Sequence, residues 1–187
     1  MRGDLYHELL ISGFGGQGVV LAGRLIATAG LAEGREVVWA PSYGPEMRGG
    51  PVHCTIIVSS GRIGSPEVSL ADSLLIMDAA SMDLFGERIK PGELMVLNSS
   101  LVQARPESDS LQVVEVPATE TAEMLGDTRV ANVVMLGAFL AMRPIVSPNS
   151  VLEAMSLLAQ QARTKPDLLE LNRRALARGA EFARDPS

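Results

Sequence analysis

Apolar and polar positions follow two different periods along this chain. Short runs of aliphatic and β-branched residues are typical of strands, which we predict at residues 5–11, 36–40, 52–58, 73–78, 93–97 and 111–116. Longer stretches with apolar residues three or four positions apart are typical of helices, which we predict at residues 17–33, 79–86, from 117, 130–142, 150–162 and 166–184. This order predicts an α/β fold with an open, mostly parallel sheet, helices on both faces and a helical C-terminal third. The chain has no internal repeat or linker, so residues 1–187 are predicted to form a single domain.

Three local features refine this prediction. Residues 59–62 predict a β-hairpin turn with a return strand at 63–66, and residues 90–92 predict a turn before the fifth strand. The helix at 130–142 is apolar nearly all round, so it must be covered on more than one side. In a domain of this size, we expect part of that cover to come from another chain.

The first strand leads into a glycine-rich turn and a helix. The turn reads Gly13-Phe14-Gly15-Gly16-Gln17-Gly18. In this pattern, Gly13 is expected to permit the tight turn, Gly15 to let a ligand approach the backbone, and Gly18 to let the helix pack closely on the strand. The start of the helix would offer unpaired N–H groups and a positive dipole end to a phosphate or carboxylate. Plain strand-to-helix corners carry the same glycines, so spacing alone leaves a structural turn open.

Ordinary NAD binding is the less favoured interpretation of this turn. An NAD site has an acidic residue about 20 positions further on, at the end of the second strand, to hold the ribose hydroxyls. Here that strand ends in Trp39-Ala40-Pro41, while Glu33 and Glu36 lie before it or at its start.

The loop after the second strand carries a second candidate site. It reads Pro41-Ser42-Tyr43-Gly44-Pro45-Glu46-Met47-Arg48-Gly49-Gly50-Pro51. Turn chemistry explains its prolines and glycines but not the charged residues beside them. The guanidinium of Arg48 could bind a phosphate or carboxylate, although a solvated loop in which Arg48 pairs with Glu46 is the alternative. Long loops after strands usually carry function, which favours a site or an interface.

Composition excludes several other classes. The net charge is −6 and no long Lys/Arg run occurs, so nothing indicates a nucleic-acid interface. The lone Cys54 excludes a disulfide framework and a four-cysteine cluster on this chain, and it fits a reducing cytoplasm. We expect no secretory signal peptide, and the sequence has no apolar run of the ~18 residues that a membrane span needs.

The remaining chemistry-bearing residues favour structural roles. Cys54 is expected to pack in the core. His53 precedes it in the same strand and must point to the opposite face, so the two cannot form a dyad. Asp78 ends the fourth strand, where ligands gather in α/β sheets, but capping of the helix at 79–86 is the favoured role.

Taken together, these motifs resemble the gamma subunit of 2-oxoacid:ferredoxin oxidoreductases. The resemblance runs from about residue 7 to the C-terminus and rests on the glycine turn, on Tyr43-Gly44-Pro45-Glu46-Met47-Arg48-Gly49-Gly50, on Ser65-Pro66 and on Ala71-Asp72. The loop looks closer to 2-oxoglutarate or branched-chain 2-oxoacid subunits than to pyruvate subunits. Indolepyruvate oxidoreductases have a related domain with a different loop.

The resemblance implies a Rossmann-like domain in a hetero-oligomeric enzyme. Such enzymes oxidatively decarboxylate a 2-oxoacid, reduce ferredoxin and form an acyl-CoA. Thiamine diphosphate, Mg and iron–sulfur clusters would lie on the partner alpha, beta and delta subunits, and coenzyme A would touch this chain. The cofactor-binding residues would be Gly13, Phe14, Gly15, Gly16, Gln17, Gly18, Ser42, Tyr43, Arg48 and Gly49. The interface residues would be Pro45, Glu46, Met47 and Gly50, with no catalytic residue and no metal on this chain.

Two other functions stay open at this point. One is a stand-alone nucleotide-binding oxidoreductase, which the end of the second strand disfavours. The other is a purely structural subunit whose glycine turn is only a corner. In either subunit role, the isolated chain is expected to be inactive, and its exposed apolar interface would favour an artificial homodimer.

Overall fold

The sheet is mixed but mostly parallel, as predicted. The computed structural model describes residues 5–42, 50–106, 108–161 and 167–184. Within these residues the strands are β1 (Tyr6–Phe14), β2 (Glu36–Pro41), β3 (Pro51–Ser59), β4 (Ala71–Ile76), β5 (Ile89–Asn98) and β6 (Gln112–Val116). They form one sheet in the order β2-β3-β1-β4-β5-β6. β3 is antiparallel to both its neighbours, and the other pairings are parallel.

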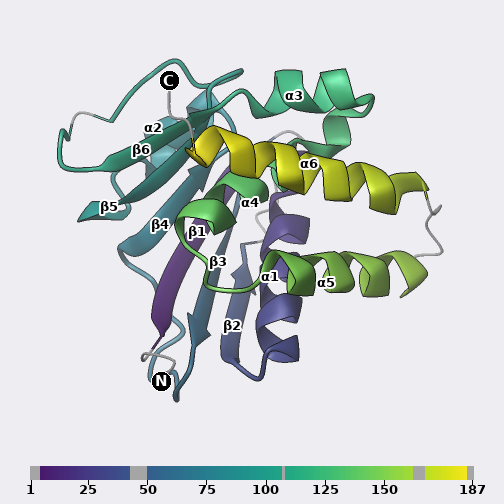
Figure 1. Cartoon of the computed structure of the whole chain (residues 1–187). Coiled ribbons are helices and arrows are strands. Elements are labelled where there is room, and N and C mark those ends of the chain that lie inside the picture. The colour runs from purple at the N-terminus through teal and green to yellow at the C-terminus, as the bar shows by residue number, and fades with distance from the viewer. Residues whose placement is uncertain (1–4, 43–49, 107, 162–166, 185–187) are drawn as a thin grey trace.

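Helices cover the two faces of the sheet unequally. They are α1 (Val19–Ala32), α2 (Ala79–Phe85), α3 (Ala118–Leu125), α4 (Ala131–Met142), α5 (Pro148–Gln161) and α6 (Asp167–Arg184), with a short 3₁₀ turn, η1 (Thr128–Val130), before α4. In Figure 1, α1, α4, α5 and α6 lie in front of the sheet and α2 lies behind it. Strand side chains alternate accordingly, so Leu9 and Ile11 join the larger core in front, whereas Leu10 joins a smaller core behind. None of the described helices is both long and apolar enough to cross a membrane.

The expectation that another chain helps to cover α4 is wrong. Helix α6 lies directly across α4 and, with the sheet, α1 and α3, buries ten of its twelve residues within this chain. The two helix backbones touch where glycines face them. A Cβ on Gly137 would overlap the Leu176 carbonyl oxygen, and a Cβ on Gly179 would overlap that of Val134. The all-round apolar pattern therefore indicates a central helix of the domain.

Two predicted turns are also wrong. Residues 63–66 form no return strand, because Ile63 and Val68 pack into the smaller core instead of pairing with β3. The hairpin region of this sheet is instead β2 with β3, joined through residues 42–50. Residues 90–92 lie inside β5, where Gly92 adopts a φ of 82°. The pairing between β4 and β5 shifts register there, so the turn signal marks an irregularity within a strand.

Candidate functional site

The carboxyl ends of the parallel strands meet at one edge of the sheet, and three helices begin there. Helix α1 follows β1, α2 follows β4 and α3 follows β6. After β1, the next two strands, β2 and β3, lie on one side of it in the sheet. The following strands, β4 to β6, lie on its other side, so the strand order reverses at β1. Ligands of open α/β sheets bind outside such a reversal point, which makes the start of α1 the first place to look.

Side chains cap α2 and α3, but none of the described side chains caps α1. Asp78 accepts a hydrogen bond from the Ser81 N–H (2.9 Å) and so caps α2, which confirms the structural alternative for Asp78. Asn98, at the end of β5, caps α3 by accepting from the Ala118 N–H (3.1 Å). Helix α1 begins after Gly18, has no acidic residue in its first turn, and receives no side-chain cap from the part of the chain that the structure describes. Its positive end therefore remains available for an anion.

The role predicted for Gly13 is wrong. Gly13 is a strand residue paired with Val52, and its φ lies outside the left-handed region. A Cβ there would lie 2.6 Å from Gln17 Oε1 and 2.7 Å from the Met77 Cβ. Gly13 is thus required because Met77, which follows β4, and Gln17 of the turn pack tightly against β1.

The turn itself is made by Gly16 and Gly18, with φ values of 107° and 76° that favour glycine. Gln17 braces it from inside: the Phe14 N–H donates to Gln17 Oε1 (2.6 Å), and the Gln17 N–H donates to the Phe14 carbonyl (3.1 Å). Gln17 was predicted to contact a cofactor, but its side-chain oxygen is occupied by the turn. A Cβ on Gly16 would meet nothing within 4 Å, so this corner of the turn is open.

The fold brings the second motif to the first. Between β1 and β3, the Gly15 N–H donates to the Gly50 carbonyl at 3.3 Å. Between β2 and β3, the Ser42 N–H donates to the His53 carbonyl at 2.9 Å. Both ends of the loop therefore lie at the edge that carries the glycine turn. Residues 43–49 lie outside the described residues, so the sites expected at Tyr43, Pro45, Glu46, Met47, Arg48 and Gly49 stay predictions from the sequence.

One residue of this site was not predicted from the sequence. Asn132, on α4, donates through Nδ2 to the Gly18 carbonyl at 3.0 Å. It lies 114 positions from that glycine, so no local motif joins the two. The available signal was a single amide in a helix of otherwise apolar and small residues.

The nearby Arg129 does not add a free positive charge. Its guanidinium makes a forked contact with Asp127, with Nε–Oδ1 and Nη2–Oδ2 distances of 2.9 and 2.6 Å. These hydrogen bonds lower the pKa of the Asp127 carboxyl to about 2. The pair is neutral overall, so among the described residues an anion at α1 would be bound mainly by backbone N–H groups.

Cys54 packs in the core and His53 points to the opposite face of the sheet, as predicted. The Cys54 thiol donates to the Val19 carbonyl (3.4 Å) on the α1 side, and burial raises its pKa to about 12. His53 faces the other side of the sheet, where its ring lies 4.7 Å from that of Phe85. A buried thiol with so high a pKa is not a nucleophile.

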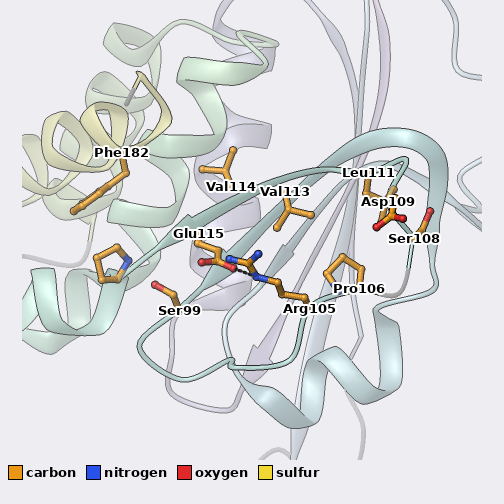
Figure 2. Close-up of a pocket in the computed structure, with 11 residues that line it drawn as sticks. Ser99, Arg105, Pro106, Ser108, Asp109, Leu111, Val113, Val114, Glu115 and Phe182 are labelled. Atoms are coloured by element: carbon orange, nitrogen blue, oxygen red, sulfur yellow. Dashed lines mark ion pairs between the residues drawn. The ribbon is translucent and has the colours of Figure 1, made fainter. Parts of the chain in front are cut away.

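A separate cavity of about 540 Å³ lies along β6, the edge strand, as Figure 2 shows. Arg105 in its wall is already paired with Glu115, with Nε 2.7 Å from Oε1, and Asp109 adds negative charge. β6 is three strands from β1, or about 14 Å at the usual strand spacing. This cavity therefore offers no anion site comparable with the start of α1.

Several known proteins are similar to this chain in sequence and in fold. The pattern of the family described as "pyruvate ferredoxin/flavodoxin oxidoreductase" matches residues 8–182. The ketoisovalerate oxidoreductase subunit VorA of Methanothermobacter thermautotrophicus is 36% identical over 94% of this chain. The 2-oxoglutarate synthase subunit KorC of Methanocaldococcus jannaschii is 34% identical over 98% of this chain and 97% of that protein. The crystal structure of the keto/oxoacid ferredoxin oxidoreductase gamma subunit from Geobacter sulfurreducens is 33% identical, with a TM-score of 0.80, over 95% of this chain and 98% of that one.

The relatives differ in length. This chain spans 36% of the VorA proteins of Methanothermobacter thermautotrophicus and Methanothermobacter marburgensis, but nearly the whole of the KorC protein. The matched region therefore occurs both inside a longer polypeptide and as a subunit of its own.

Proposed function

The chain belongs to the pyruvate ferredoxin/flavodoxin oxidoreductase family, and from this premise we propose that it is the gamma subunit of a multi-subunit 2-oxoacid:ferredoxin oxidoreductase. The whole enzyme would convert a 2-oxoacid to an acyl-CoA and CO₂ and pass two electrons to ferredoxin. Thiamine diphosphate, Mg and iron–sulfur clusters would belong to alpha, beta and delta partners. The relatives' names support a substrate such as 2-oxoglutarate or a branched-chain 2-oxoacid.

Within that enzyme, the role of this chain is assembly and presentation of coenzyme A. The observation that carries this role is the uncapped start of α1. The N–H groups of Val19, Val20 and Leu21 have no helical acceptor and find no other partner among the described residues. A pyrophosphate placed there would accept those hydrogen bonds, and the helix dipole would add about 0.3–1 kcal/mol. The open corner at Gly16 leaves room for the ligand to approach.

Binding the phosphates would orient coenzyme A rather than perform chemistry on this chain. A ligand held at its phosphate end keeps its thiol within a limited volume, which raises the effective concentration of the thiol at a partner's active site. A stand-alone NAD enzyme is less well supported, because β2 ends at Pro41 and is followed by Ser42, without an acidic residue at either position.

We predict that Gly16→Ala raises the KM for coenzyme A of the assembled enzyme about tenfold and leaves the KM for the 2-oxoacid unchanged. The new methyl group would occupy open space beside the phosphates, and a tenfold loss corresponds to about 1.4 kcal/mol. Steady-state kinetics with each substrate varied in turn measures both constants.

Gly34→Ala is the matched control. Gly34 also has a positive φ (73°) and open space around its missing side chain, but it follows the opposite end of α1. Both variants carry the same kind of backbone strain, about 1–2 kcal/mol, so strain alone would affect them alike. Equal KM values for coenzyme A in the two variants would count against a phosphate site at the turn.

A further inference from the structure

Asn132 is a buried amide in an apolar helix, and only one of its two polar atoms makes a hydrogen bond among the described residues. The residue is only 2% exposed. Its Nδ2 donates to the Gly18 carbonyl, but its Oδ1 is buried and has no donor among the residues that the structure describes. A buried acceptor without a donor is unfavourable, and such a group in a native protein calls for an explanation.

The hydrogen bond from Asn132 is not needed to satisfy Gly18. The Gly18 carbonyl already accepts the first hydrogen bond of α1, from the Ala22 N–H at 2.8 Å. The same carbonyl also fixes which way the amide points, because Nδ2 rather than Oδ1 must face an acceptor. The contact therefore constrains the direction of the Gly18 carbonyl in addition to satisfying it.

Fixing that carbonyl also fixes a donor at the start of α1. The Gly18 carbonyl and the Val19 N–H belong to one planar trans peptide group, so they point in opposite directions. With the carbonyl directed toward Ala22 and Asn132, the Val19 N–H points out of the start of the helix.

The conformation of Gly18 also explains why a hydrogen bond from another helix is needed to hold its peptide group. It has a φ of 76°, and a Cβ there would overlap Asn132 Nδ2, so the amide fills the space that a side chain would take. Glycine is the most flexible residue, and its peptide group would otherwise reorient easily.

From these contacts we infer that Asn132 is a positioning residue for the ligand at α1: it holds the Val19 N–H toward a bound pyrophosphate. The inference rests on the proposed function, since it assigns a role at the same anion site. It links helix α4, from the C-terminal third of the chain, to the glycine turn near its start.

Asn132→Leu tests this role, because leucine has a similar size and no amide. Coenzyme A titrated calorimetrically into the assembled complex should show a Kd about tenfold higher than that of the unmodified complex, with the KM for the 2-oxoacid unchanged. Thermal unfolding should stay within about 3 °C of the unmodified protein, because the unpaired Oδ1 disappears and the Gly18 carbonyl keeps Ala22. A merely structural asparagine would give the opposite result, a lower melting temperature with an unchanged Kd.

A second variant and a control complete the test. Asn132→Asp keeps the shape, cannot donate when ionised and adds a negative charge near the phosphates, so its Kd should rise more than that of Asn132→Leu. Asn172→Leu, a half-buried asparagine on α6, should bind coenzyme A as the unmodified complex does.

The outcomes separate this inference from the proposed function. If both Asn132 variants bind coenzyme A normally while Gly16→Ala still raises its KM, Asn132 is not a positioning residue but the phosphate site stands. If Gly16→Ala also has no effect, the proposed site itself is wrong.

Discussion

Gly179→Ala should lower the free energy of unfolding by about 3 kcal/mol, the upper part of the range for an overpacked core. The methyl group would fall on the Val134 carbonyl oxygen, in the crossing where α6 covers α4. Backbone atoms cannot move aside by changing a rotamer, so the two helices would have to separate. Their separation would open the core, since Phe139 and Leu176 are both buried there. Urea unfolding of the chain measures the loss.

Gly61→Ala is the control for this prediction. Gly61 lies in an exposed segment after β3, a Cβ there would meet nothing within 4 Å, and its φ is not positive. Alanine at that position should be neutral or slightly stabilising, because it restricts the unfolded chain. Equal stabilities for the two variants would contradict the close backbone contact between α4 and α6.

Asn98→Leu should also destabilise the chain by about 3 kcal/mol, in contrast to Asn132→Leu. Asn98 is fully buried, and its Nδ2 donates to the Met77 carbonyl (3.0 Å) and to Thr119 Oγ1 (2.9 Å). Its Oδ1 accepts from the N–H groups that begin α3. Leucine would leave several of these buried groups unpaired, each at a cost of about 1–3 kcal/mol.

The same substitution at two buried asparagines therefore gives a direct comparison, measured by urea unfolding of both variants. Both the Nδ2 and the Oδ1 of Asn98 make hydrogen bonds, which join the end of β4, β5 and α3. Of Asn132, only Nδ2 makes one among the described residues, to the Gly18 carbonyl. If Asn98→Leu and Asn132→Leu lose the same free energy of unfolding, the number of hydrogen bonds that each amide makes does not distinguish a structural asparagine from a functional one.

Much of the fold was predictable because strands and helices differ in period. The β-branched run at 52–58 and the apolar run at 73–78 correspond to β3 and β4, and the glycine turn leads from a central strand into α1. The resemblance to gamma subunits is confirmed by the family match and by the gamma subunit structure. Two motifs at a fixed separation were more specific than either alone.

The errors came from contacts that sequence pattern does not encode. Glycines at 61 and 92 signal turns, but whether a turn forms depends on what the flanking residues pack against. Ile63 and Val68 pack into the smaller core, and Gly92 lies within β5. The apolar face of α4 could not reveal that its cover, α6, lies in the same chain.

The details of the site were the least predictable. The motif identified the right turn, but Gly13 is required for packing and Gln17 for bracing the turn. Asn132 reaches Gly18 only because α4 crosses the sheet beside α1, a consequence of tertiary structure alone.

Isolation of the tagged chain from its native cells would test whether the chain works as a subunit of a larger oxidoreductase. We expect that larger partners co-purify, that the complex contains thiamine diphosphate and iron, and that it reduces ferredoxin with a 2-oxoacid and coenzyme A. A chain recovered alone, without thiamine diphosphate or iron, would contradict the proposed role as a subunit.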